Sequence, residues 1–339
     1  MDLFTTTALA TVLAGFFVGI VVGLTGMGGG ALMTPALIFL GVGSGNAATI
    51  VTADLTAAAV YKTGGAAMHY REGSPNLRLA GWLILGSVPM AFLGPWLVHH
   101  FANGDSDQLD TTLKTMIGIA LLFAASTYAL RLYVNLRRVR RGGPPADPDP
   151  KIRPLPTFLV GALGGLLVGI TSVGSGSVIM IALLMLYPGL SAVKLVGTDL
   201  TQAVPLVLAA AISNIAINGL EWEIAIPLIV GSVPGTLIGA RIAPRVPQSF
   251  IRRGIVVVLT MSGVALLYKA GWTPIGDSDS SPYVVAAVGI AMIVLVPLIW
   301  GLIRKQEGMP MFGSPTIAEL EKLPLDKGNR ANKKPAARS

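Results

Sequence analysis

The chain has no cysteine among its 339 residues, only three histidines, and few charged residues, which make up 12% of the total. Without cysteine it has no disulfide framework and no thiolate metal site. The histidines, His69, His99 and His100, all fall at the ends of predicted membrane spans, which argues against a histidine metal cluster. We expect no metal, no cofactor and no catalytic residue, because no nucleophile, metal cluster or acid–base pair is assembled.

Apolar residues are abundant, at 53% of the chain, and the mean hydropathy is +0.69. A soluble domain of this size would have to expose large apolar patches. The sequence therefore predicts an all-α polytopic membrane protein, with the lipid bilayer as a partner. The net charge of +8 could indicate nucleic acid, but the basic residues are concentrated in a few short segments typical of topology signals, so we expect no nucleic-acid partner.

Seven apolar stretches have roughly the 20 residues needed to cross a bilayer. They lie near residues 46–68, 79–98, 111–133, 194–216, 224–241, 252–270 and 283–303. Two longer runs, 3–41 and 155–190, are interrupted near the middle by stretches rich in glycine or in glycine and serine. Each of these two runs is predicted to form a broken helical hairpin. No Lys or Arg precedes the first run, so we expect it to remain as a membrane segment.

The two halves of the chain repeat one another. The repeated motifs are Gly-Ser-Val-Pro at Gly86 and Gly231, and Asp-Leu-Thr at Asp54 and Asp199, both 145 residues apart, together with residues 23–30 and 169–176. We predict a first membrane repeat at 1–133, a Pro-rich linker at 134–154, a second repeat at 155–270, an additional transmembrane helix within 271–303, and a basic tail at 304–339. Each repeat would contain one hairpin and three transmembrane helices.

The charges of the loops indicate that the two repeats have opposite orientations. The linker carries Arg137, Arg138, Arg140, Arg141, Lys151 and Arg153, so the positive-inside rule places it in the cytoplasm. Residues 241–253, with four arginines, are then cytoplasmic only if the hairpin at 155–190 enters and leaves on one face. The C-terminal tail is predicted to be cytoplasmic and the N-terminus to be outside. This arrangement is typical of secondary transporters, which bind substrate where inverted repeats meet.

The two hairpin breaks are the candidate substrate-binding site. A helix N-terminus should follow each break, so that free N–H groups and positive dipole ends converge on a small anionic substrate. The candidate residues are Thr25, Gly26, Gly28, Gly29, Gly30, Thr171, Ser172, Gly174, Ser175 and Gly176. Tight helix packing is the competing interpretation of such glycines. A nucleotide site is not expected, because no Gly-Lys-Ser/Thr follows.

Three ionisable residues lie well inside predicted spans: Asp54, Lys62 and Asp199. Burial favours the neutral form of a carboxyl group, so Asp54 and Asp199 could carry protons in step with an anion. Alternatively, each caps the second part of a kinked helix. Lys62 could contact the anion or extend to the membrane surface. Two further cavity-lining candidates, Gln202 and Asn214, could instead bond a neighbouring helix.

The segment Gly23–Gly30, its continuation to Thr34-Pro35-Ala36-Leu37, the stretch Thr52–Thr56 and the repeated Gly-Ser-Val-Pro resemble the sulfite exporter TauE/SafE family of membrane permeases. The resemblance covers the chain to about residue 270, and the second copy is looser. It implies transport of sulfite, sulfonates or related organosulfur anions across the bacterial cytoplasmic membrane. The extra terminal span and basic tail depart from this plan.

Together these features predict a proton-coupled secondary transporter of small sulfur oxyanions that works by alternating access. An anion channel with the same dipole-lined site is the alternative. A membrane enzyme, or a sensor that uses the basic tail, is less well supported. The sequence is compatible with a homo-oligomer.

Overall fold

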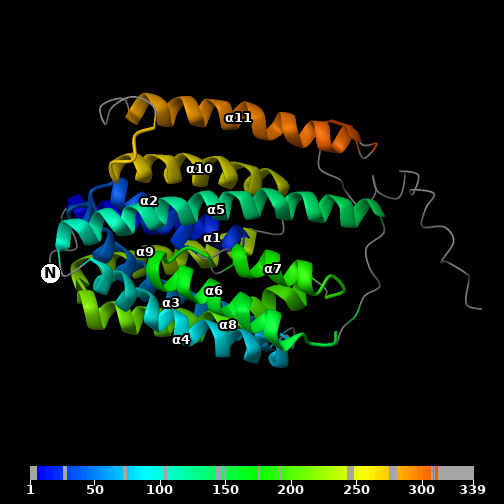
Figure 1. The fold of residues 1–339 in the computed structure, drawn as a ribbon, viewed down its shortest axis with the longest axis horizontal. Coiled ribbons are helices and arrows are strands. Elements are labelled where there is room, and N and C mark those ends of the chain that lie inside the picture. The colour runs from blue at the N-terminus through cyan, green and yellow to red at the C-terminus, as the bar shows by residue number, and fades with distance from the viewer. Residues whose placement is uncertain are drawn as a thin grey trace, which may run out of the picture.

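The structure is a computed structural model that describes residues 6–25, 29–71, 75–102, 105–141, 147, 150–174, 176–190, 192–242, 248–274, 281–306, 308 and 310–311. Within these residues the regular structure is entirely helical, with eleven α-helices and one short 3₁₀ helix (Figure 1). The prediction of an all-helical protein is confirmed.

The predicted spans correspond closely to long helices. These are α3 (Ala47–Arg71), α4 (Leu77–Phe101), α5 (Ser106–Arg141), α8 (Ala192–Asn218), α9 (Trp222–Ile242), α10 (Gln248–Lys269) and α11 (Ser281–Gln306). The two long runs are each broken into two helices, as expected. The first forms α1 (Thr6–Thr25) and α2 (Gly30–Phe39), followed by the 3₁₀ helix η1 (Val42–Gly45), and the second forms α6 (Pro154–Thr171) and α7 (Val178–Leu186).

Seven helices among the described residues are long and apolar enough to cross a membrane: α1, α4, α5, α6, α8, α9 and α11. This set differs from the seven predicted spans. It includes α1 and α6, the first helix of each hairpin, and it lacks α3 and α10. Helix α3 is rich in alanine, threonine and glycine, and α10 carries two arginines within its first two turns. The chain is a multi-pass membrane protein.

Glycines bring α1 against α9 and α4 against α6. A Cβ atom added at Gly165 of α6 would lie 2.2 Å from the backbone oxygen of Ser87 on α4, and one at Gly235 of α9 would lie 2.3 Å from that of Phe16 on α1. Such close backbone approach is what small residues four positions apart provide in membrane helices. These glycines therefore allow α1 to pack closely against α9, and α4 against α6.

Each hairpin enters and leaves at one end of the bundle. Helix α1 runs parallel to α9, and the turn that follows α2 returns to the start of α9, where Gly43 lies against Ile224. In the second hairpin, the hydroxyl groups of Thr157 in α6 and Tyr187 after α7 are 2.6 Å apart. Helix α6 runs parallel to α4, and Asn76, just before α4, bonds Thr198 near the start of α8. The second hairpin therefore opens at the start of α8. The first hairpin opens at the start of α9, which follows the end of α8, so the two hairpins open at opposite ends of the bundle.

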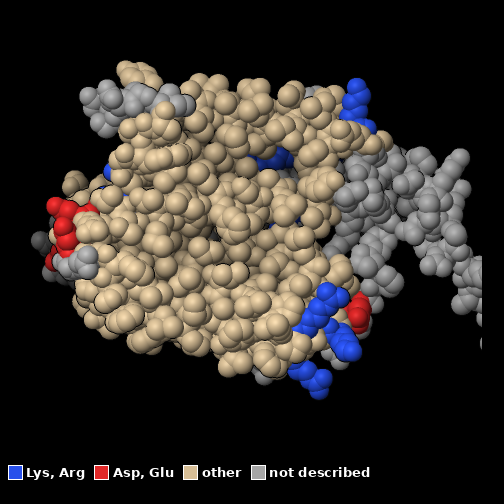
Figure 2. Space-filling model, in the orientation of Figure 1, with Lys and Arg blue, Asp and Glu red and all other residues tan. Residues whose placement is uncertain are grey.

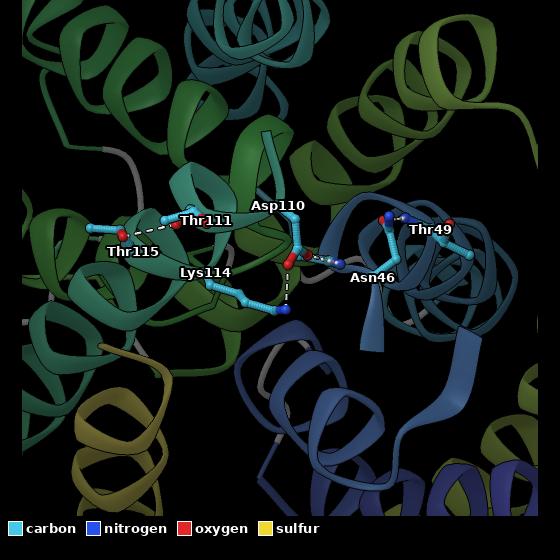
Figure 3. Close-up of polar contacts among 7 residues, drawn as sticks. Asn46, Thr49, Asp110, Thr111, Lys114 and Thr115 are labelled. Atoms are coloured by element: carbon cyan, nitrogen blue, oxygen red, sulfur yellow. Dashed lines mark hydrogen bonds and ion pairs between the residues drawn. The ribbon is translucent and has the colours of Figure 1, made fainter. Parts of the chain in front are cut away.

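The opening of the first hairpin is the acidic end, defined by Asp110 and Glu221. Asp110 accepts a hydrogen bond of 2.9 Å from the backbone N–H of Ala47 and pairs with Lys114, as Figure 3 shows. Asn46 caps the same helix, since its side chain accepts a bond of 3.1 Å from the N–H of Thr49. A carboxylate at a helix N-terminus satisfies a free donor and opposes the positive end of the helix dipole.

The opening of the second hairpin is the basic end, defined by Lys151 and Arg153. Figure 2 shows most of the visible Asp and Glu side chains at one extremity of the molecule and most of the visible Lys and Arg side chains at the other, where one acidic group lies beside them. The tan surface between them carries almost no charge, which fits the apolar belt of a membrane protein. Helix α11 lies on the outside of the bundle and packs mainly against α10 (Figure 1).

Candidate functional site

The tips of the two hairpins touch. A Cβ atom added at Gly30, the first residue of α2, would lie 2.0 Å from the backbone oxygen and 2.4 Å from the Oγ of Ser172, which follows α6. Both residues are buried. Only glycine allows this approach, so the contact explains the residue at position 30. The structure thus brings together two candidate residues that are far apart in the sequence.

The first break is held by a tyrosine that the sequence analysis did not select. The backbone N–H of Gly29 donates a hydrogen bond of 3.0 Å to the Oη of Tyr61 on α3. The carbonyl of Gly29 accepts bonds of 2.9 and 2.8 Å from the N–H groups of Leu32 and Met33. With these bonds α2 begins directly after the break, as predicted. Thr25 donates to the carbonyl of Val21, 2.7 Å away. Gly26 and Gly28 lie outside the described residues.

The second break adopts a left-handed backbone. Ser172, Gly174 and Gly176 have φ values of 58°, 130° and 88°. The Thr171 hydroxyl donates to the carbonyl of Leu167 at 2.6 Å and accepts from the N–H of Val173 at 3.1 Å, so it shapes the turn. Helix α7 follows, as predicted. Ser175 lies outside the described residues.

Asp54 connects α3 to both hairpins. Its carboxylate is completely buried, and its Oδ2 accepts a hydrogen bond of 2.7 Å from the hydroxyl of Thr34 on α2. The side chain of Ser172 also interacts with it. Its Oδ1 is buried and has no hydrogen-bond partner among the described residues. A buried acceptor without a partner is costly unless it binds a proton or a ligand.

Asp199 occupies the matching position of α8 but has different partners. It is 2% exposed, and its Oδ1 accepts a hydrogen bond of 3.1 Å from Nε2 of Gln202 one turn away. The amide oxygen of Gln202 in turn lies 3.5 Å from the Oγ of Ser87 on α4. The carboxylate is therefore held by its own helix rather than by a hairpin tip.

Neither aspartate is a helix cap. Helix α3 runs without interruption through Asp54, and α8 through Asp199. A capping residue would need a non-helical backbone at the start of a helix. The capping alternative is wrong.

Lys62 is a buried basic residue that interacts with both carboxylates. It is 6% exposed and interacts electrostatically with Asp199 and with Asp54. Its side chain is buried in the bundle, so the alternative in which it extends to the membrane surface is wrong. The matching position of the second half is Val207, which is also buried. The buried cation therefore breaks the similarity of the two halves.

Asn214 has a packing role. Its Nδ2 donates to the carbonyl of Gly169 on α6 at 3.0 Å and to that of Ala210 at 2.9 Å. Both bonds are to backbone oxygens, and one of them joins α8 to the helix that carries the second tip. Gln202 likewise bonds Asp199 and faces Ser87. For both residues, bonding within or between helices is the arrangement found.

Three residues around the site, Thr34, Tyr61 and Ser87, were not predicted from the sequence. A weak signal existed for two of them, because Thr34 precedes a proline in the conspicuous first hairpin and Ser87 belongs to the duplicated Gly-Ser-Val-Pro. Tyr61 has no such signal, since a tyrosine in an apolar helix is ordinary. Among the described residues, no group of three or more His, Cys, Asp or Glu side chains is arranged to hold a metal ion.

Comparison with known proteins agrees with this architecture. Residues 11–266 match the family described as sulfite exporter TauE/SafE. The chain is 37% identical over 263 residues to the probable membrane transporter protein YjnA of Bacillus subtilis (strain 168), covering 77% of this chain and 100% of that protein. It is 23% identical over 265 residues to the probable membrane transporter protein YdhB of the same strain, covering 76% of this chain and 99% of that protein. No solved structure matches.

Proposed function

Because the chain belongs to the sulfite exporter TauE/SafE family of membrane transporters, we propose that it is a secondary transporter of small sulfur-containing oxyanions such as sulfite or a sulfonate. The observation that carries the proposal is the contact between Gly30 and Ser172, beside the buried carboxylate of Asp54. An anion that enters between the two tips would meet the N-terminus of α2 from one half and the serine of the other.

The proposal includes two inverted halves, and the helix contacts support it. Helix α1 of the first half corresponds to α6 of the second, and α4 corresponds to α9. The contact between α1 and α9 is therefore the counterpart of the contact between α6 and α4. Helix α3 pairs with its own counterpart α8, and α5 with α10. These are the contacts expected of a pseudo-two-fold axis lying between the halves and in the membrane plane. Alternating access would then be a rocking of the two halves about the hairpin tips.

We place the basic end in the cytoplasm, following the positive-inside rule. Described basic residues that lie at this end and are exposed include Arg78, Lys151, Arg153 and Arg241. The N-terminus would then be outside, and the linker and the C-terminal tail inside. The membrane is the bacterial cytoplasmic membrane by analogy with the relatives in Bacillus subtilis.

Three kinds of group would bind the anion. The first is the N-terminal end of α2, whose dipole carries roughly half a positive charge. The second is hydroxyl donors, foremost Ser172. The third is Lys62, whose charge offsets the two carboxylates that would otherwise repel an anion. Because Gly30 and Ser172 are in contact, the tips must separate by the width of the substrate for it to enter, which couples binding to motion of the halves.

Proton coupling would use the two aspartates. The unpaired oxygen of Asp54 can take a proton when an anion enters, which removes the negative charge beside the substrate. Asp199 would serve in the same way from the other half. The net charge moved with each monovalent anion would then be smaller than that of the anion alone.

Uptake into proteoliposomes tests the proposal. The panel is sulfite, thiosulfate, taurine and sulfoacetate, with acetate as the carboxylate comparison. A carrier gives saturable uptake and exchange of labelled for unlabelled anion, whereas a channel gives flux that does not saturate at much higher rates. Lack of saturable uptake of every sulfur anion would contradict the proposal, and uptake of acetate alone would contradict the substrate class.

A further inference from the structure

Helix α11 lies beyond the part of the chain matched by the family, and its contact with α10 contains a cluster of donors. At the basic end of this helix pair, the Cζ of Arg253 on α10 lies 5.1 Å from the ring centre of Trp300 on α11. Arg304, one turn further along α11, is close enough to repel Arg253 electrostatically. Two guanidinium groups therefore share one small region beside a tryptophan.

The free groups in this cluster are hydrogen-bond donors. The Nε of Arg253 and the Nε1 of Trp300 are both buried, and neither has a hydrogen-bond partner among the described residues. Trp300 is 8% exposed and Arg304 is 1% exposed, and the Nε of Arg304 donates to the carbonyl of Pro310 at 2.7 Å. Arginine and the indole N–H only donate. Their complement is a ligand with several acceptor oxygens and a negative charge, and a phosphate group has both.

The position of the cluster selects the kind of phosphate. Arg253 is about 8 Å along α10 from its start at Gln248, and Arg304 is about 3 Å from the end of α11, at 1.5 Å per residue. Both helix ends lie at the basic end, where the proposed orientation places the lipid headgroups. Figure 2 shows Lys or Arg atoms recessed in a hollow of the apolar surface over α10 and α11. Next to Trp300 in the sequence, α11 exposes Leu298, Ile299 and Leu302, apolar residues suited to contact lipid.

We propose that Arg253 and Trp300, with Arg304 behind them, bind the phosphate group of an anionic phospholipid in the leaflet at the basic end. The lipid neutralises the repulsion between the two arginines and holds α11 against α10. Basic pockets between transmembrane helices on the cytoplasmic side are known to bind lipid headgroups in this way. The site is separate from the hairpin tips, so it stands or falls independently of the transported anion.

The test uses the full-length protein, purified in detergent and freed of lipid. Binding of a short-chain phosphatidylglycerol is measured by native mass spectrometry and by thermal shift. Arg253→Gln removes the guanidinium group, and Trp300→Phe keeps the ring over the cation but loses the donor. Lys305→Gln is the matched control, because Lys305 directly follows Arg304 on α11 and its charge is exposed. Phosphatidylcholine and glycerol 3-phosphate are the comparison ligands.

We expect Arg253→Gln to weaken phosphatidylglycerol binding by about 10- to 100-fold, the value of a charge-assisted bond. Trp300→Phe should weaken it severalfold, and Lys305→Gln by about fivefold at most, the value of one surface cation. Equal weakening by Arg253→Gln and Lys305→Gln would overturn the site. Equal stabilisation by glycerol 3-phosphate would overturn the assignment to a lipid, and equal binding of phosphatidylcholine would overturn the requirement for net charge. If Arg253→Gln does not fold, Trp300→Phe must weaken phosphatidylglycerol binding more than Lys305→Gln does, and equal weakening by these two variants would overturn the site.

Discussion

Replacing Gly30 with alanine changes the contact on which the proposed site depends. The added Cβ would lie 2.0 Å from the carbonyl oxygen of Ser172. An ordinary van der Waals contact is 3.4 Å or longer, so the two tips must move apart by about 1.4 Å. Overpacking of this kind costs about 1–3 kcal/mol of stability. A displacement of about 1 Å can lower a rate by roughly 100-fold when binding groups must converge on one small ligand.

Anion binding and uptake separate the effect on the site from the effect on the fold. Gly231→Ala is the first control, because its Cβ would lie 2.1 Å from the carbonyl of Val12, a clash of the same size at the interface of α9 and α1. Gly81→Ala is the second, since no atom lies within 4 Å of its added Cβ. Gly30→Ala should raise the anion Kd and reduce uptake by roughly 100-fold.

The first control should lower thermal stability by a similar amount but keep the anion affinity. The second should match the unmodified protein in both measurements. The reasoning is refuted if Gly30→Ala binds and transports the anion as well as Gly81→Ala does, or if Gly231→Ala loses as much affinity as Gly30→Ala.

Three further predictions concern the polar groups around the bundle. Asp54→Asn and Asp199→Asn should each reduce the stimulation of anion uptake by an inward proton gradient in proteoliposomes, and unchanged stimulation in both variants would remove their coupling role. Asp110→Ala should lower the free energy of unfolding by about 1 kcal/mol, because α3 loses a cap, with transport retained; unaltered thermal unfolding in detergent would contradict this. Tyr61→Phe should leave the Gly29 N–H without its acceptor and lower the free energy of unfolding by about 1–3 kcal/mol, measured by thermal unfolding. It should also slow anion uptake, measured as flux into proteoliposomes.

The helices and their breaks were predictable because they follow from local properties of the sequence. The length of an apolar run and the glycines within it separate a single span from a hairpin. The counting of loop charges also required the second hairpin to return to its own side, and the bond between Thr157 and Tyr187 agrees. The α3 and α8 helices were predicted as spans, although local signals left open that Asp54 and Asp199 cap a kink.

The arrangement within the site was less predictable, because it depends on contacts between distant residues. The duplicated Asp-Leu-Thr suggested equivalent roles for the two aspartates, yet one bonds a hairpin tip through Thr34 and the other bonds Gln202. Lys62, six residues beyond the first copy of this motif, could have extended to the membrane surface, and only the packing of α3 against α8 brings it within electrostatic range of both carboxylates. Sequence patterns of one chain do not report such cross-bundle partners.

The most direct test of the account is to locate the bound anion. Selenite has the charge and shape of sulfite, and selenium gives an anomalous signal in crystals. The predicted result is a selenium peak placed so that the selenite oxygens can accept hydrogen bonds from the Gly30 N–H and the Ser172 hydroxyl. A peak elsewhere in the bundle, or no peak at a selenite concentration that saturates transport, would contradict the claim that the hairpin tips hold the substrate.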